Sequence, residues 1–137
     1  MSNPNPQILE KVTQWLDYAD EDLRLASHGL NMKSACPYRL IAYHAQQCAE
    51  KCIKAYLVYH SIDFPYTHNI KTLLKLCGKN ADWAAALKDA EELTPYAITA
   101  RYPGEDEEVT KQEAKKAIKT ASRVSQTIRE VLGQHGL

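Results

Sequence analysis

The sequence has little glycine, almost no phenylalanine, no excess of either charge and no long hydrophobic run. Its 137 residues include 5 Gly and 1 Phe, and this composition disfavours a β-rich fold. The 17 basic and 17 acidic side chains cancel, which argues against a general nucleic-acid-binding protein, because such proteins are strongly basic. No apolar run approaches the roughly 18 residues that a membrane-spanning helix needs, so we expect no membrane contact.

Recognisable signals for export, metal binding and common catalysis are also missing. The first residues, MSNPNPQILEKV, lack the basic-then-apolar pattern of a signal peptide, so a cytoplasmic location is expected. The 4 Cys include no CxxC pair, which argues against a zinc knuckle. His44, Cys48 and Cys52 share one helical stripe, but its apolar character favours a packed core. We expect no metal and no cofactor, and the length predicts a single domain over residues 1–137.

Two long helices are predicted in the first half of the chain. The first begins at Asn5-Pro6, with Asn5 as N-cap, and ends near Gly29. Its outer face is expected to be acidic, with Glu10, Asp17, Asp20, Glu21 and Asp22. The second runs from Pro37 to about His60. Its small apolar residues predict a central position, because they allow close helix approach; the expected buried set is Leu40, Ile41, Ala45, Cys48, Ala49, Cys52, Ala55, Tyr56 and Tyr59.

The second half of the sequence predicts a short helix, a kinked helix and a final long helix. Thr67 is the expected cap of the short helix, which closes at Gly78. A fourth helix begins at Asn80 and is kinked or restarted at Thr94-Pro95. Thr110-Lys111-Gln112-Glu113 is a capping box that opens the last helix. The predicted fold is all-α: an antiparallel up-down bundle of four main helices plus one short helix.

Two groups of polar residues are candidate ligand-binding sites. His44, Gln47 and Lys51 share one face of the second helix, with Gln46 and Glu50 adjacent. Such a row can bind a phosphate or a base edge, although spacing alone favours a solvated or interface-facing stripe.

The other candidate lies where the fourth helix ends. Arg101 beside Tyr102 could clamp an anionic ligand or, equally, cap the helix or pair with Glu105. The basic last helix is expected to be solvated or to pair with the acidic first helix; weak RNA contact is the less favoured alternative.

Residues 43–57, YHAQQCAEKCIKAYL, resemble the central helix of HEPN domains. Two further pieces agree in family order: Thr67-His68-Asn69-Ile70 followed by Leu73, and Arg101-Tyr102-Pro103 followed by Thr110 and Glu113-Ala114.

The resemblance implies a helical bundle that forms a homodimer. It also implies a small protein encoded beside a minimal nucleotidyltransferase, as in toxin–antitoxin pairs. It assigns a functional or interface role to His44, Gln47, Lys51, Arg101 and Tyr102, whereas His68 either shares that role or helps to cap the short helix.

The sequence departs from the family's catalytic pattern. Many members are metal-independent RNases in which an Arg is followed four to six residues later by a His, but Arg101 is followed by Tyr-Pro-Gly-Glu-Asp-Glu-Glu. We therefore expect no catalytic residue and predict a nucleotide-binding or accessory protein, with a minimal nucleotidyltransferase, a nucleotide or RNA as its partner. The alternatives are a metal-independent RNase toxin that uses His44 or His68 with Arg101, and a structural dimerisation module without a ligand.

Overall fold

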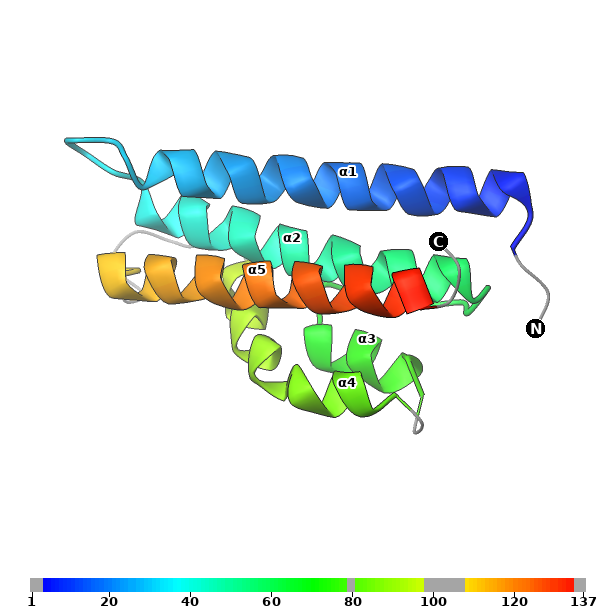
Figure 1. Cartoon of the computed structure of the whole chain (residues 1–137). Coiled ribbons are helices and arrows are strands. Elements are labelled where there is room, and N and C mark those ends of the chain that lie inside the picture. The colour runs from blue at the N-terminus through cyan, green and yellow to red at the C-terminus, as the bar shows by residue number, and fades with distance from the viewer. Residues whose placement is uncertain (1–3, 79–80, 98–107, 135–137) are drawn as a thin grey trace.

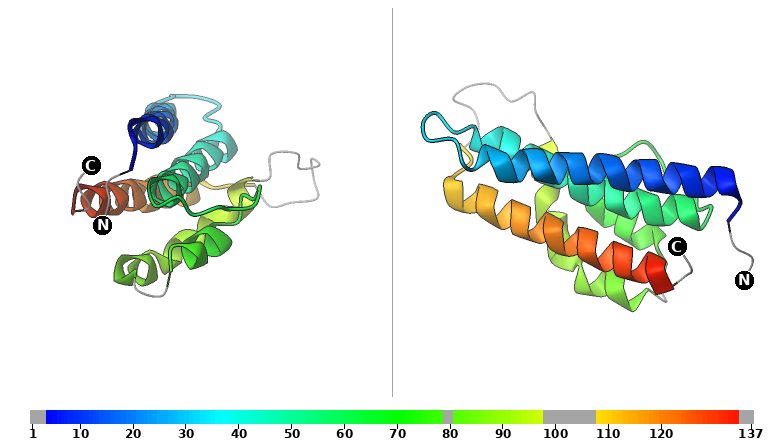
Figure 2. Two further views of the ribbon diagram at one scale, coloured as in Figure 1. Left: turned by 90° about the vertical axis from the view of Figure 1, so that its right-hand side faces the viewer. Right: turned by 45° about the horizontal axis from the view of Figure 1, so that its top comes forward.

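The structure, a computed structural model, describes residues 4–78, 81–97 and 108–134, and every element in these ranges is helical. The long helices α1 (Pro6–Gly29), α2 (Tyr38–Tyr59) and α5 (Lys111–Gln134) lie side by side (Figure 1). The short helices α3 (Ile70–Leu76) and α4 (Asp82–Ala86) and the 3-10 helix η1 (Lys88–Ala97) lie on the opposite side of α2 and α5 from α1 (Figure 2). The predicted all-α bundle is confirmed.

Helix α2 is the centre of the bundle. It packs against α1, α5, η1 and α3, and its small residues are fully buried: Ala42, Ala45, Cys48, Ala49, Cys52 and Ala55. Small side chains let neighbouring helices approach closely, so the predicted central position is confirmed. The prediction that Cys48 and Cys52 belong to the packed core is also confirmed.

The prediction that Leu40 is buried is wrong. Its side chain is 40% exposed, because position 40 lies one turn before His44, on the partly exposed face of α2. Ile41 takes the inward place and packs beside Ala26 and Ala114. A Cβ at Gly29 would lie 2.9 Å from Ile41 Cγ1, so the absence of a side chain at Gly29 lets the end of α1 reach α2.

The predicted caps of the two outer long helices are confirmed. Asn5 Oδ1 accepts a hydrogen bond of 2.9 Å from the Ile8 N–H, and Pro6 occupies the first helical position. At the start of α5, Thr110 Oγ1 accepts from the Glu113 N–H and Glu113 Oε1 accepts from the Thr110 N–H, each at 3.1 Å. This reciprocal pair satisfies two N–H groups that the helix itself leaves without a partner.

The caps predicted around α3 and η1 differ from those observed. Asn69, not Thr67, caps α3, since Asn69 Oδ1 accepts from the Thr72 N–H at 3.2 Å. Thr94 does not restart a helix; its hydroxyl accepts from the Ile70 N–H at 3.1 Å, at the first residue of α3. Residues 82–97, expected as one kinked helix, form α4 and then η1, with Pro95 inside η1. Pro95 lacks the N–H that an α-helix would need there.

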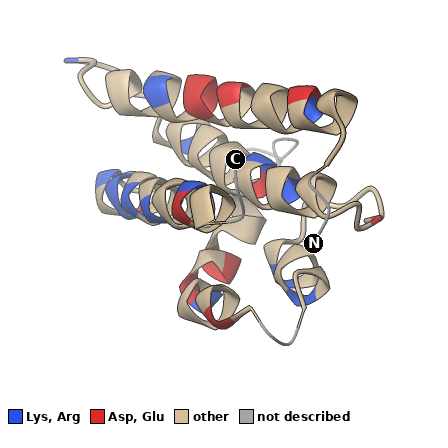
Figure 3. Ribbon diagram, turned by 45° about the vertical axis from the view of Figure 1, so that its right-hand side comes forward, with Lys and Arg blue, Asp and Glu red and all other residues tan. Residues whose placement is uncertain are grey.

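Ion pairs join α5 to its neighbours, and the pair with α1 is the one that the charge pattern predicted. Arg129 Nη2 lies 2.7 Å from Asp20 Oδ2 of α1, and Lys116 Nζ lies 3.2 Å from Glu92 Oε2 of η1. Arg123 pairs with Asp89 of η1. In the ribbon of Figure 3, basic residues recur along α5 and acidic residues along α1. These pairs are largely exposed, so each contributes little to the free energy of unfolding.

Candidate functional site

Helix α2 carries a polar arc on an otherwise apolar helix. Gln46, Gln47, Glu50 and Lys54 are buried, whereas His44 and Lys51 are partly exposed. At 100° per residue these six side chains fall within about half of the helix circumference. Buried polar groups are costly unless they are hydrogen-bonded, and their partners define two clusters, one at each side of the arc.

The first cluster joins α2 to α1 through Asp22. Asp22 Oδ1 lies 2.8 Å from His44 Nδ1, and Asp22 Oδ2 lies 2.5 Å from Lys51 Nζ. The Asp22 side chain is only 11% exposed, compared with 28% for His44 and 23% for Lys51. One nearly buried carboxylate therefore holds two partly exposed side chains that stand two helical turns apart on α2.

The prediction that Asp22 belongs to the outer acidic face of α1 is wrong. Position 22 follows Ala19 by three residues and precedes Ala26 by four, and both alanines are buried. This spacing places Asp22 on the inward stripe, and it is the signal in the sequence that identifies it. A carboxylate on that stripe requires a cationic or hydrogen-bonding partner, which His44 and Lys51 supply.

The second cluster joins α2 to the segment before α3 through Glu50. Glu50 Oε1 accepts from Gln46 Nε2 at 3.0 Å and lies 2.8 Å from His68 Nδ1, and Glu50 Oε2 lies 3.0 Å from Lys54 Nζ. The Lys54 ammonium also lies 5.6 Å from the centroids of the Trp15 and Phe64 rings. Glu50 and Lys54 are buried, so this pair organises the packing of three segments.

Gln47 connects the two sides of the polar arc. Its Nε2 donates to Gln46 Oε1 at 2.7 Å, and it stands one turn from both His44 and Lys51 on α2. In the described part of the chain, no buried side-chain nitrogen or oxygen lacks a hydrogen-bond partner. The buried polar atoms of the arc are therefore all hydrogen-bonded.

The carboxylates of Asp22 and Glu50 determine which ring nitrogen of His44 and of His68 stays available to a ligand. An ionised carboxylate only accepts hydrogen bonds, so Asp22 and Glu50 assign the proton of His44 and His68 to Nδ1. In the neutral ring Nε2 is then an acceptor. The Asp22 charge also offsets that of Lys51, so this end of the arc offers hydrogen-bonding groups without the excess positive charge that a polyphosphate favours.

The structure brings together some of the residues predicted as ligand-binding. His44 and Lys51 meet at Asp22, Gln47 lies between the clusters, and His68 contacts Glu50. Arg101 and Tyr102 lie outside the described residues. The residue spacing on the second helix indicated Gln46 and Glu50 only as neighbours of the site, and it did not indicate Asp22 or Lys54 as members.

The cysteines take no part in this arrangement. Cys48, Cys52 and Cys77 are buried. A hydrogen bond with Cys52 and burial raise the pKa of the Cys48 thiol, and burial raises the pKa of Cys77 to about 12. Within residues 4–78, 81–97 and 108–134, no three His, Cys, Asp or Glu side chains are grouped so that they could hold a metal ion. No helix in these ranges is long and apolar enough to span a membrane.

Comparisons with known proteins agree with this architecture. The crystal structure of TT1696 from Thermus thermophilus superimposes with a TM-score of 0.75 at 26% sequence identity, covering 88% of this chain and 97% of that one. The crystal structure of ST0689, an archaeal HEPN homologue, gives a TM-score of 0.66 at 26% identity, covering 87% and 95%. A search of curated proteins finds no match. The HEPN domain model matches residues 12–131, and the chain therefore belongs to the HEPN domain family.

Proposed function

We propose that this HEPN protein is a non-catalytic binding or accessory protein. It would form a homodimer and bind a nucleotide, or a minimal nucleotidyltransferase in a toxin–antitoxin-like pair. The ligand site would comprise His44, Gln47 and Lys51 on the polar arc and His68 beside it, with Arg101 and Tyr102 assigned from the sequence alone.

The observation that carries this proposal is that Asp22 holds both His44 and Lys51. The Oδ1–Nδ1 and Oδ2–Nζ distances of 2.8 and 2.5 Å leave the lysine ammonium already paired. Stabilising the extra charge that develops on a phosphate during RNA cleavage requires cations that are free to converge on it. A paired lysine and an acceptor nitrogen are better suited to a neutral base edge or to a polar protein surface.

Calorimetric titration of the purified chain with ATP, with GTP and with a nucleotidyltransferase encoded next to it tests the proposal. We expect binding of at least one ligand, and a loss of about tenfold or more in affinity for Lys51→Ala and for Arg101→Ala. Lys71→Ala is the matched control, because Lys71 is an exposed lysine of α3 outside the arc. The absence of binding to all three would leave the ligand-free structural module as the better interpretation.

One observation favours the RNase alternative. Asp22 orients His44 through Nδ1 and leaves Nε2 available, which is how a carboxylate positions a general base. This alternative predicts cleavage of RNA in the presence of a chelator, abolished by Arg101→Ala and by His44→Ala or His68→Ala. Cleavage that survives all these substitutions would come from a contaminating nuclease.

A further inference from the structure

One face of α1 carries charged side chains that form no ion pair with any other residue that the structure describes. Asp17, Glu21, Arg24 and His28 follow one another at steps of four, three and four residues, which places them on one face of the helix. In the described residues none of them forms an ion pair, whereas the neighbouring acids Asp20 and Asp22 pair with Arg129, His44 and Lys51. The internal pairing of the fold therefore uses the acids beside this face and leaves the face itself open.

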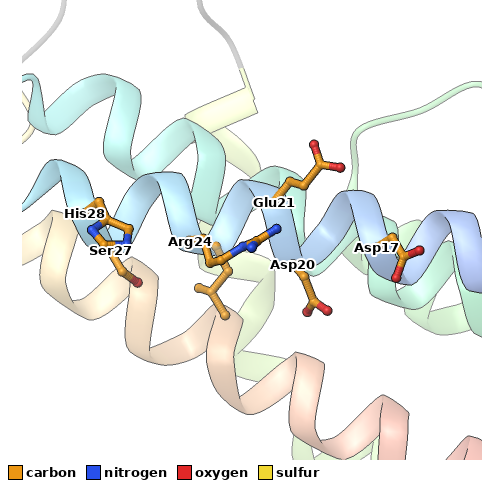
Figure 4. A pocket seen from close by; sticks show the side chains of 7 residues that line it. Asp17, Asp20, Glu21, Arg24, Ser27 and His28 are labelled. Atoms are coloured by element: carbon orange, nitrogen blue, oxygen red, sulfur yellow. The ribbon is translucent and has the colours of Figure 1, made fainter.

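The order of charges along this face is antisymmetric. Its N-terminal half is acidic, with Asp17 and Glu21, and its C-terminal half is basic, with Arg24 and His28 when protonated (Figure 4). Two copies of such a helix repel when parallel, because like charges then lie opposite each other. When they are antiparallel about a two-fold axis near Asp22, Glu21 of each copy faces Arg24 of the other and Asp17 faces His28.

The exposed apolar residues beside the face fit the same arrangement. A surface hollow of about 640 Å³ runs along α1 and is lined by Asp17, Asp20, Glu21, Leu23, Arg24, Ser27 and His28. On the other edge of the face, Tyr18 is 55% exposed and Leu25 is 57% exposed. Tyr18 and Leu25 are seven residues apart, on either side of the same axis, so the antiparallel arrangement brings Tyr18 of one copy close to Leu25 of the other.

We propose that α1 is a self-complementary interface, on which a second copy of this chain docks with its own α1 antiparallel about a two-fold axis near Asp22. The inference rests on the homodimer of the proposed function and specifies its surface. The exposed aromatic and aliphatic side chains supply apolar area at the contact. The two symmetry-related pairs of charges fix its direction and register, which is the usual role of charge across an interface.

Charge reversal with rescue tests this interface in the full chain. Glu21→Arg alone places an arginine opposite Arg24 twice per dimer, and Arg24→Glu alone places two glutamates opposite each other. We expect each single reversal to raise the dissociation constant of the dimer by about tenfold or more. The double variant Glu21→Arg/Arg24→Glu restores opposite charges and should return the constant to within about threefold of the parent. Sedimentation equilibrium measures all four proteins.

Lys71→Glu is the matched control, because it reverses one exposed charge on α3, on the side of the bundle away from α1. It should leave the dissociation constant unchanged, and circular dichroism should show that every variant is folded. Single reversals that leave the dissociation constant unchanged would overturn the α1 interface. A double variant that dimerises as weakly as the single variants would do the same. Neither result would contradict the homodimer itself. A parent protein that stays monomeric at all concentrations would overturn both. Nucleotide titration of Glu21→Arg tests the ligand site separately, since none of its residues is changed.

Discussion

Asp22 of α1 and Lys51 of α2 form an ion pair with 2.5 Å between Oδ2 and Nζ, and the second oxygen of the same carboxylate holds His44. The pair joins the two helices that share the largest interface of the bundle. It also fixes the orientation of two residues of the proposed ligand site. Changes at Asp22 should therefore affect both stability and ligand binding.

Replacement of Asp22 should cost much more stability than replacement of its neighbour Asp20. Asp22→Ala removes two charge-assisted contacts from a nearly buried position and should lower the free energy of unfolding by about 2 kcal/mol. Asp20→Ala removes an exposed pair with Arg129 and should cost less than about 1 kcal/mol. Both changes place alanine inside α1, so helix propensity affects them similarly. Urea denaturation measures the difference, and equal costs would show that the Asp22 cluster does not stabilise the fold.

The buried pair of Glu50 and Lys54 should behave as a unit in a double-mutant cycle. Glu50→Gln leaves the Lys54 ammonium buried without a carboxylate and should lower the free energy of unfolding by about 3 kcal/mol. In a Lys54→Met background the same change should cost about 1 kcal/mol or less, because methionine can pack between Trp15 and Phe64. Additive costs in chemical denaturation would contradict a direct interaction.

The capping box at the start of α5 should make stability depend on pH in the acidic range. Hydrogen bonds from the Thr110 backbone and side chain lower the pKa of Glu113 in the folded state. A lowered pKa contributes stability above the unfolded-state value near 4.5, and this contribution disappears as the pH falls through the folded-state pKa. The parent should exceed Glu113→Gln in stability near pH 6, and the gap should close in acid. Thr110→Ala should reduce the gap near pH 6, and a gap that stays constant into acid would argue against the cap.

The cysteines should react with an alkylating reagent in an order set by burial. Cys36 is partly exposed, while Cys48, Cys52 and Cys77 are buried, and burial raises the pKa of Cys77 to about 12. The thiolate is the reactive form, so iodoacetamide at pH 8 should modify Cys36 first and the other three only after the protein opens. Peptide mass spectrometry of the native and the urea-unfolded protein measures the order. Early modification of Cys77 in the native protein would contradict the packing around α3.

Sequence periodicity predicted the elements of this fold better than their details. The Asn5 cap and the Thr110–Glu113 box depend on neighbouring residues only, and both are confirmed. The Thr94 hydroxyl accepts from the N–H of Ile70, 24 residues earlier in the chain, and local patterns contain no information about such a contact. Leu40 and Asp22 show the same limit. Hydrophobicity suggested that Leu40 is buried, and charge suggested that Asp22 is exposed. The position of each residue around its helix determines the opposite in both cases.

The site was predictable only in part, for a related reason. The family resemblance identified His44, Gln47, Lys51 and His68, all of which lie on or next to the polar arc. It did not identify Asp22, because the partner of a buried polar group comes from another helix and depends on how α1 is rotated against α2. The prediction for Arg101 and Tyr102 concerns residues outside the described ranges, and it stays a prediction.

The hydrogen bond from the Ile70 N–H to the Thr94 hydroxyl has a consequence for how the protein opens. It ties the first residue of α3 directly to the 3-10 helix η1. A transient detachment of residues 88–97 would release the start of α3 as well, while α1, α2 and α5 remain packed. The amide protons of the two segments should therefore exchange with deuterium together, as one sub-globular unit, and ahead of those in the three long helices.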